Sequence, residues 1–466
     1  MSSGEGGLDP ATSRAVEALQ ALVRIPTVSH PDELDPTTFD ALLVELEQRF
    51  PLVHELLEVT RVHSHGLLLR WAGRSGARPV VLMAHLDVVP VEDPARWTHP
   101  PFSGAVVDGS IWGRGTLDDK GCVVAICTAV EELLEAGHVP AQDVWLSFGC
   151  DEEVFGQAAP EAVRVLRERG VQPWFVLDEG GAVAGGAFPG VRRPVAVVGV
   201  TEKGVTSLLL RAEGRGGHAS TPARNGPTAR IARAITALER SPMPASVPPP
   251  TVELFRRIAP HAGLPLGPVL AGAARVPALL VRALLAAGPE TAAMTRTTFA
   301  VTTLQGSPAL NVIAGAATAG VNIRVMLGDT VEDVLAHVRR AVGKDVEIEV
   351  VEEGAASPLS PYSTSGATDG EHRDEAFDLL ERTIEQVFPE AVPAPYVMMA
   401  ATDSRHFTAI CERVYRFAPF RMSKAQRESI HSHDEHLGVQ DLLDGVAWYR
   451  RLLEDLPQGL PERSPA

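Results

Sequence analysis

The sequence has 466 residues, of which 45% are hydrophobic and 22% charged, and its formal net charge is −17 with a pI near 5.4. This composition is that of a globular protein, and its length favours two domains over one. The acidic balance argues against nucleic acid or an anionic membrane surface as a partner. The first residues lack a basic and apolar leader, and none of the four cysteines forms a CxxC pair. We therefore expect a cytoplasmic protein.

The first strong structural signal is an apolar run that ends in a histidine and an aspartate. Periodicity predicts helices over 10–24 and 37–50 and strands within 57–71. The apolar run at 79–84 then reads as a strand buried on both faces, with His85 and Asp87 at its carboxyl end. A carboxylate that accepts the second ring N–H of a histidine orients the ring for metal binding. The alternative is a histidine satisfied by the aspartate without a metal.

Acidic residues also cluster at three further places in the chain. Asp118 and Asp119 precede an apolar helix over 122–134, where they could bind a hard cation or simply cap the helix. A phosphate-binding loop is excluded because GxxxxGK[ST] is absent. Asp151-Glu152-Glu153 and Asp178-Glu179 each follow an apolar strand-like run. Since ligands gather at the carboxyl ends of strands in open α/β sheets, this recurrence favours one site over separate surface turns.

The character of the chain changes near residue 200. A glycine-rich loop with His218 follows a strand at 205–213, and it lacks the third glycine of a dinucleotide fingerprint. The pattern then predicts an α+β unit, made of helices at 227–240 and 330–342 and strands near 298–304, 317–327 and 346–351. Residues 262–288 are apolar, but Arg275 and Arg282 and three prolines interrupt them. We expect a buried or lid-forming helix hairpin there rather than a membrane span.

The pattern of the last hundred residues predicts a return to the first domain. After a linker at 354–370, the pattern predicts a helix at 373–387, a strand at 414–417 and a closing helix at 438–455. His431, His433 and His436 lie between the last two elements, and all three are candidate metal ligands.

Five motifs in order resemble the co-catalytic dizinc aminoacylase/carboxypeptidase superfamily. They are His85-x-Asp87, Gly-Arg-Gly-x-x-Asp118, Asp151-Glu152-Glu153, Asp178-Glu179-Gly180 and His431-x-x-x-Glu435. Leu117-Asp-Asp-Lys120, Val200-Thr-Glu-Lys-Gly204, Thr402-Asp-Ser-Arg405 and Tyr415-Arg-Phe417 resemble most the carboxypeptidase S and N-fatty-acyl-amino-acid hydrolase/synthase branch.

The resemblance implies an α/β fold with a mostly parallel sheet flanked by helices. The catalytic domain would comprise residues 1–199 and 356–466. Residues 200–355 would form an inserted α+β lid and dimerisation domain, and the protein would be a homodimer through that lid.

The resemblance also implies a ligand set for two zinc ions, for which cobalt or manganese could substitute. His85 and Asp178 would bind one ion and Glu153 and His431 the other, with Asp118 bridging both; the family pattern prefers His431 to the runner-up His433. Asp87 would orient His85, and the Asp118–Asp119 peptide would be cis.

By the same resemblance, Glu152 would be the general base that activates water for attack on an amide carbonyl. His218 would reach the active site of the partner subunit and stabilise the oxyanion. Arg405 would bind the substrate carboxylate, and Asn311 and Arg324 would contact substrate from the lid.

The expected activity is hydrolysis of N-acyl amino acids, with residues 262–288 as a candidate wall for a long apolar acyl group. A carboxypeptidase or dipeptidase acting on short peptides is the alternative enzyme. A non-catalytic protein that keeps the fold is the alternative from another class.

Overall fold

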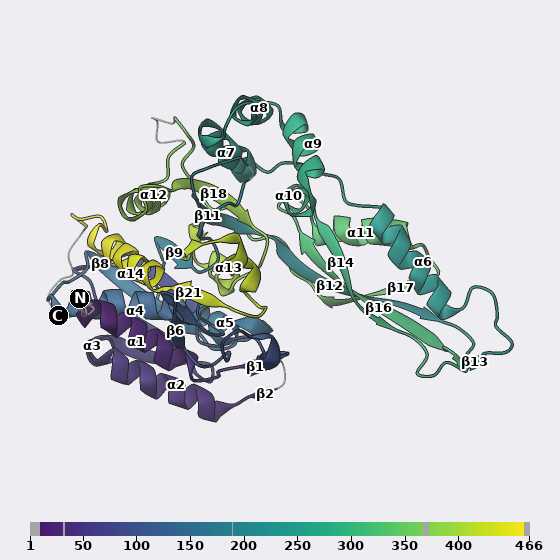
Figure 1. The fold of residues 1–466 in the computed structure, drawn as a ribbon, viewed down its shortest axis with the longest axis horizontal. Helices are drawn as coiled ribbons and strands as arrows, with labels where there is room; N and C mark the ends of the chain where they lie inside the picture. The colour runs from purple at the N-terminus through teal and green to yellow at the C-terminus, as the bar shows by residue number, and fades with distance from the viewer. Residues whose placement is uncertain (1–9, 31–32, 189, 367–371, 461–466) are drawn as a thin grey trace, which may run out of the picture.

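The computed structural model describes residues 10–30, 33–188, 190–366 and 372–460. It has a large α/β body and an elongated arm that projects from it, and both ends of the described chain lie on the body (Figure 1). A cluster of short helices, α7–α10, sits on the body next to the base of the arm.

The body is built on one mixed sheet. Its strands, in spatial order, are β20 (Arg421–Met422), β10 (Val183–Ala184), β11 (Val195–Glu202), β19 (Val414–Arg416), β9 (Phe175–Asp178), β5 (Ser75–His85), β8 (Gln142–Gly149), β4 (Gly66–Trp71) and β3 (Glu58–Val62), while β18 (Val392–Met398) pairs with β11. The central strands β19, β9, β5 and β8 are parallel neighbours, and β3, β4 and β8 pair antiparallel. The predicted α/β class is confirmed, with a sheet that is mixed rather than uniformly parallel.

Helices cover both faces of this sheet, which explains the continuous apolar runs in its central strands. One face carries α1 (Pro10–Val23), α2 (Pro36–Arg49), α3 (Pro51–Leu56), α4 (Lys120–Glu135), α12 (Glu375–Val387) and α14 (Val439–Glu454). The other carries α5 (Ala158–Glu168) and the 3-10 helix η4 (Asp403–Ala409). Within β5, Leu82 and Ala84 face the first layer, and Val81 and Met83 face the second. The strand period of two therefore divides one apolar run between two cores.

The arm is a second, antiparallel sheet with helices on one face. Its strand order is β14 (Thr298–Gln305), β16 (Ala316–Val325), β12 (Gly204–Glu213) and β17 (Glu347–Glu352). Helices α6 (Pro227–Arg240) and α11 (Val331–Val342) pack on it, and the short pair β13 (Gly217–His218) and β15 (Val312–Ile313) lies at the far end (Figure 1). The predicted order of strands and helices in this region is confirmed within one or two residues.

The apolar segment of the insert folds as helices on the body. These are α7 (Pro249–Ile258), α8 (Leu266–Ala273), α9 (Pro277–Ala287) and α10 (Pro289–Ala293). Leu254, Leu280 and Leu284 are buried in one cluster with Phe188 and with Ala394 of β18. Part of the segment predicted as a lid therefore packs against the main sheet and not against the arm. The predicted domain boundaries near residues 200 and 355 stay predictions. No helix among the described residues is long and apolar enough to span a bilayer.

Short elements complete the fold around the sheet edges. They are β1 (Ser29–His30), β2 (Glu33–Leu34), β6 (Ala105–Val107), β7 (Ser110–Trp112), β21 (His436–Gly438), α13 (Lys424–Ser429) and the 3-10 helices η1 (Pro94–Arg96), η2 (Glu152–Val154) and η3 (Ala259–His261). The four cysteines are buried and free. The predicted cytoplasmic location stays a prediction.

Candidate metal centre

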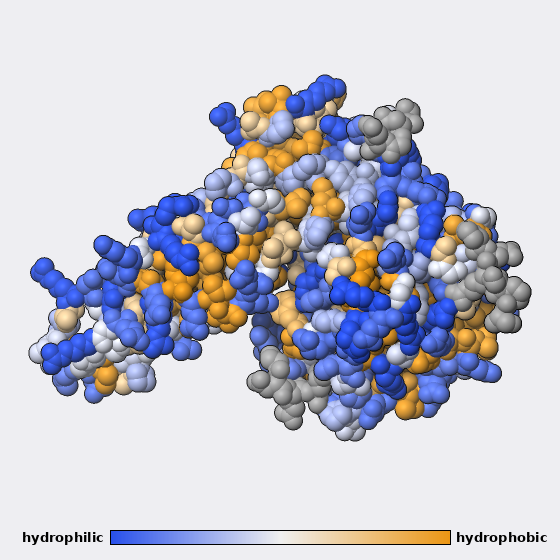
Figure 2. Space-filling view, turned by 180° about the vertical axis from the view of Figure 1, so that it is seen from behind, coloured by the Kyte–Doolittle hydropathy of each residue, from blue (hydrophilic) through white to orange (hydrophobic). Residues whose placement is uncertain are grey.

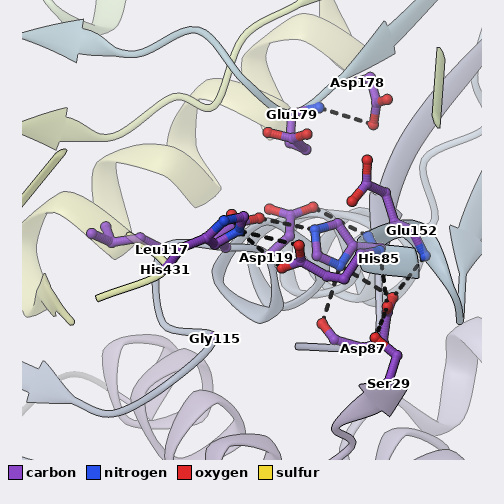
Figure 3. Close-up of polar contacts among 12 residues, drawn as sticks. Ser29, His85, Asp87, Gly115, Leu117, Asp119, Glu152, Asp178, Glu179 and His431 are labelled. Atoms are coloured by element: carbon purple, nitrogen blue, oxygen red, sulfur yellow. Dashed lines mark hydrogen bonds and ion pairs between the residues drawn. The ribbon is translucent and has the colours of Figure 1, made fainter. Parts of the chain in front are cut away.

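The predicted acidic segments meet at the carboxyl ends of three neighbouring strands. His85 ends β5, Asp178 ends β9, and Glu152 and Glu153 follow β8 in the turn η2. Because these strands are parallel neighbours, their ends lie at one edge of the sheet. Figure 3 shows His85, Asp119, Glu152 and His431 converging there, with Asp178 and Glu179 facing them across a gap.

His85 is held by carboxylates at both ring nitrogens. Its Nδ1 lies 3.1 Å from the backbone oxygen and 3.3 Å from Oδ1 of Asp87, and its Nε2 lies 2.9 Å from Asp118 Oδ1. Asp87 is fully buried and also accepts from Ser29 Oγ at 2.7 Å and from the backbone N–H groups of Glu152 and Glu153 at 3.2 and 3.1 Å. Asp87 therefore fixes the imidazole and the Glu152–Glu153 turn together, which leaves Nε2 of His85 as the nitrogen directed at the centre.

Asp118 lies between the two histidines predicted as ligands. Its second oxygen, Oδ2, is 3.0 Å from His431 Nε2, and the same nitrogen is 3.1 Å from Glu153 Oε2. Potential ligand atoms of His85, Asp118 and Glu153 all lie within 4.8 Å of one another. His433, the runner-up, is instead 3.2 Å from the neighbouring Ser432 Oγ through its Nδ1. The geometry thus favours His431 over His433.

The loop that carries Asp118 is held in place by a buried glutamate. Glu435 is fully buried; its Oε2 accepts from Arg114 at 2.6 Å, and its Oε1 accepts the backbone N–H groups of Gly115, Leu117 and Asp118 at 2.8 to 3.2 Å. Residue 435 is four positions after His431, so one short segment supplies both a candidate ligand and the anchor of the facing loop. The Asp118–Asp119 peptide is cis, as the resemblance implies.

Asp178 is placed differently from the other candidate ligands. Its Oδ1 accepts from the Glu179 N–H at 3.0 Å and its Oδ2 from the Ser404 N–H at 2.9 Å. It is not part of the group of ligand atoms within 4.8 Å, although each carboxylate oxygen keeps a free lone pair after one hydrogen bond. The backbone therefore orients Asp178 toward the gap from the opposite side (Figure 3).

The electrostatics of the centre favour a bound cation. Burial, together with Asp403 and Glu153, raises the pKa of Glu152 well above its usual value, and burial also raises the pKa of Glu153 and Glu179. Hydrogen bonds to Asp118 and Glu153 raise the pKa of His431 to about 10. The centre thus contains more buried acids than positive groups to balance them. A divalent cation would stabilise the ionised forms of these acids. Imidazole nitrogen and carboxylate oxygen are suitable ligands for zinc.

Two acids that sequence reasoning did not assign also belong to this environment. Asp119 is fully buried; its Oδ2 accepts the His85 N–H at 3.2 Å, and its Oδ1 has no hydrogen-bond partner among the described residues. Burial raises the pKa of Asp403 to about 8, with further contributions from Asp178 and Asp87. The Thr402-Asp-Ser-Arg405 motif was a signal for this segment, but only its arginine received a role.

The predicted substrate-binding residues lie in three separate places. Arg405 borders a cavity of about 410 Å³ at the base of the arm, where its Nη1 donates to Thr402 O at 2.9 Å. Arg324 is half-buried on β16 of the arm. His218 and Asn311 are exposed at the tip of the arm, where the Ala219 N–H donates to Asn311 O at 3.1 Å. Within one chain, the structure does not bring His218 or Asn311 to the metal centre (Figure 1).

A pocket of about 720 Å³ joins the metal centre to an apolar channel. Asp118, Glu152, Glu153 and His431 line one part of it. The remaining wall is mostly apolar and includes Ala184, Phe188, Met294, Tyr396, Met398 and Met422. Residues 262–288, all of which are described, do not line it; α10 and Met294 do. The expectation that 262–288 forms the wall is therefore wrong, because α9 packs against α10, and of this helical segment only α10 and Met294 after it border the pocket.

The fold and this donor set define a class, that of metal-dependent hydrolases with a mixed α/β body. The chain belongs to peptidase family M20/M25/M40, whose sequence model matches residues 81–455. Enzymes of this family are metal-dependent, and the protein is accordingly a metallopeptidase-family hydrolase. The family resemblance stated from the motifs is confirmed.

Curated relatives extend this likeness over most of the chain. It is 36% identical over 447 residues to the N-fatty-acyl-amino acid synthase/hydrolase PM20D1 of Xenopus tropicalis, covering 94% of this chain and 85% of that protein. It is 34% identical over 415 residues to the probable carboxypeptidase S-like 2 of Dictyostelium discoideum, covering 88% and 78%. Human carnosine dipeptidase 1 shares the fold with a TM-score of 0.67 at 16% identity, covering 95% of each chain.

The two candidate histidines give the first test of the centre. We expect His431→Ala to weaken binding of at least one metal ion by about tenfold or more, because it removes a nitrogen ligand beside Asp118 and Glu153. His433→Ala is the matched control and should leave metal affinity unchanged. Metal titration of the apoprotein by calorimetry measures both, and a loss confined to His433→Ala would reverse the assignment.

Proposed function

We propose that the protein is a dizinc amidohydrolase that cleaves N-acyl amino acids bearing apolar acyl groups. The observation that carries this proposal is the pocket of about 720 Å³, which connects the metal centre to a mostly apolar wall. A wall of this kind suits a hydrocarbon chain, and each buried methylene contributes about 0.8 kcal/mol to binding. The PM20D1 relative, which is named for N-fatty-acyl amino acids, supports the same substrate class.

The proposed metal ligands are those that the resemblance of the sequence motifs implies. His85 and Asp178 would hold one ion, Glu153 and His431 the other, and Asp118 would lie between them. Bound zinc would polarise the amide carbonyl and make a water molecule at the site more acidic. Cobalt or manganese could replace it with the same donor atoms.

Glu152 is the proposed proton carrier. It borders the pocket beside Glu153; its backbone N–H donates to Asp87, and its carboxylate makes no hydrogen bond within the described part of the chain. It would take a proton from the attacking water and donate it to the amine nitrogen as the C–N bond breaks. The products are a carboxylic acid and an amino acid. A raised pKa suits a group that must act first as base and then as acid.

Glu152→Ala tests this role. We expect kcat to fall by a factor of about 10² to 10⁴, because the general base is lost while the metal ligands stay. Metal content, measured by elemental analysis, should remain that of the wild type. If the variant lost metal instead, Glu152 would be a ligand and its role would have been exchanged with that of Glu153.

A panel of acyl lengths tests the substrate class. Lauroyl and oleoyl amino acids should have higher kcat/KM than acetyl ones, and Ala184→Phe should lower kcat/KM for the long substrates by about tenfold or more by filling the channel. Acetyl substrates serve as the control and should be little affected by Ala184→Phe. Faster turnover of acetyl substrates, or of dipeptides, would favour the alternative carboxypeptidase or dipeptidase, which the Dictyostelium relative's name suggests.

We further propose a homodimer in which His218 of one subunit completes the site of the other. Strand β14 forms an edge of the arm's sheet and leaves Val301 36% and Leu304 65% exposed. Apolar residues appear on the surface of the arm in Figure 2. An exposed strand edge of this kind is suited to pairing with a second chain. His218 is at the exposed tip of the same arm.

Subunit mixing tests the exchange of His218. Glu152→Ala and His218→Ala should each have little activity alone, but a heterodimer of the two contains one site with both wild-type residues. Random reassociation should therefore restore about a quarter of the wild-type activity. No recovery, in a mixture shown by mass spectrometry to contain heterodimers, would contradict a role for His218 in trans.

A further inference from the structure

Residues of three motifs, none of which was given a role in the sequence analysis, meet in a buried network beside the metal centre. Glu202 comes from Val200-Thr-Glu-Lys-Gly204, Thr402 and Ser404 from Thr402-Asp-Ser-Arg405, and Arg416 from Tyr415-Arg-Phe417. Glu202, Thr402, Ser404 and Arg416 are each at most 2% exposed. Their side chains lie where β11 ends and the chain leaves the body for the arm.

Glu202 is the member that joins the others. Its Oε2 accepts from the Thr402 N–H at 3.1 Å and from Thr402 Oγ1 at 3.3 Å, and it lies 3.2 Å from Arg416 Nε. Its Oε1 accepts from Ser357 Oγ at 3.0 Å, on the segment that returns from the arm. One carboxylate thus ties together the base of the arm, the loop at 402–405 and a fully buried guanidinium.

The loop at 402–405 in turn holds a candidate ligand. Thr402 Oγ1 is 2.6 Å from Ser404 Oγ, and the Ser404 N–H donates to Asp178 Oδ2 at 2.9 Å. A hydrogen bond to a carboxylate oxygen restricts where its remaining lone pair points. The orientation of Asp178 therefore depends on Ser404, and the position of Ser404 depends on Thr402 and Glu202.

We infer that Glu202 is a positioning residue for the metal ion bound by Asp178. It contacts neither the pocket's acids nor the candidate ligands directly; it acts through Thr402 and Ser404. The negative charge matters because Glu202, 3.2 Å from Nε, forms an ion pair with the buried Arg416 guanidinium, whose Nε and Nη2 have no hydrogen-bond partner among the described residues. This inference rests on the proposed ligand role of Asp178.

Glu202→Gln separates the two functions of the carboxylate, which are to accept hydrogen bonds and to carry a negative charge beside Arg416. The amide keeps the size of the side chain, but one of its two ends becomes a donor. Its oxygen can accept from Thr402 while its NH2 group donates to Ser357 Oγ, so the substitution keeps the hydrogen bonds and removes the negative charge beside Arg416. We expect the loop at 402–405 to shift and the affinity for one metal ion to fall by about 10- to 100-fold, as is typical when a residue that orients a ligand is changed.

The chain offers a matched control in Glu131. This residue is 2% exposed, as buried as Glu202, and accepts two backbone N–H groups, from Leu52 at 3.0 Å and Val53 at 2.9 Å. It lies on α4, where it anchors the start of α3 and not the metal centre. Glu131→Gln should destabilise the fold without changing metal affinity. A second variant, Thr402→Val, removes only the hydroxyl link between Glu202 and Ser404 and should weaken the same ion by a smaller factor.

The experiment is a cobalt titration of the apoprotein, followed by visible absorption and calorimetry, on the wild type, the three variants and Asp178→Asn. We expect Glu202→Gln and Asp178→Asn to weaken the same ion and to change its absorption band, while Glu131→Gln matches the wild type. Unchanged affinity in Glu202→Gln, with Asp178→Asn weakened, would overturn the inference and leave the proposed function standing. Unchanged affinity in Asp178→Asn would overturn both the ligand assignment and the inference. If Glu202→Gln does not fold, the cobalt affinity of Thr402→Val, compared with those of the wild type and Asp178→Asn, tests the inference in its place.

Discussion

The structure depends on the burial of several carboxylates at one edge of a sheet. Asp87, Asp119 and Asp178 are each at most 3% exposed, and Asp118 and Glu153 lie beside them. Ionised acids at such spacing repel one another, and burial strengthens that repulsion. The arrangement can persist only if positive charge and N–H donors compensate it. Most of the polar contacts near the centre supply that compensation, and a divalent cation is the natural remaining contribution.

Two buried acids, Asp87 and Glu435, accept hydrogen bonds from many of these donors, and each holds a different segment of the centre in place. Asp87 accepts four donors and so fixes His85 and the Glu152–Glu153 turn together. Glu435 collects three backbone N–H groups and the Arg114 guanidinium and so holds the loop of Asp118. These two acids are saturated with donors and have no capacity left for a metal. By contrast, Asp118 and Glu153, which border the pocket, direct carboxylate oxygens at the Nε2 atoms of His85 and His431. Saturation of hydrogen-bonding capacity thus separates the supporting acids from the candidate ligands.

Much of this could be predicted from the sequence because the relevant signals are local. The strand before His85 is a continuous apolar run, and such a run is expected when helices cover both faces of a sheet. Three of the candidate ligands, His85, Glu153 and Asp178, lie at or just after the ends of these strands, so the sheet topology brings them together. The positions of Asp403 and Glu202 could not be predicted in this way. Their roles arise from contacts between segments as distant as residues 202 and 402, and no periodicity encodes such a contact.

The apolar wall was predicted in the wrong segment for a related reason. Residues 262–288 are the most apolar part of the insert, but hydrophobicity alone does not distinguish a pocket wall from a packing core. Leu280 and Leu284 are buried against Phe255 and Leu254 in the helical cluster. The short helix α10 after them, which has Glu290 in its first turn, reaches the pocket instead. The more apolar helices therefore belong to a packing core, while α10 and strands of the main sheet provide the surface of the pocket.

The segments that join the body to the arm must meet two requirements. The body must hold its acids rigidly, whereas in the proposed homodimer the arm that carries His218 at its tip would have to approach the site of the other subunit. Between the two, β11 leads into β12 through Lys203, and the return segment is tied back by Ser357. Thr201 Oγ1 also donates to Ser357 O at 2.6 Å, so two adjacent residues of β11 hold the returning chain. A junction fixed at its base by buried hydrogen bonds limits any movement of the arm to the residues beyond it. The candidate metal ligands on the body side would then keep their places during such a movement.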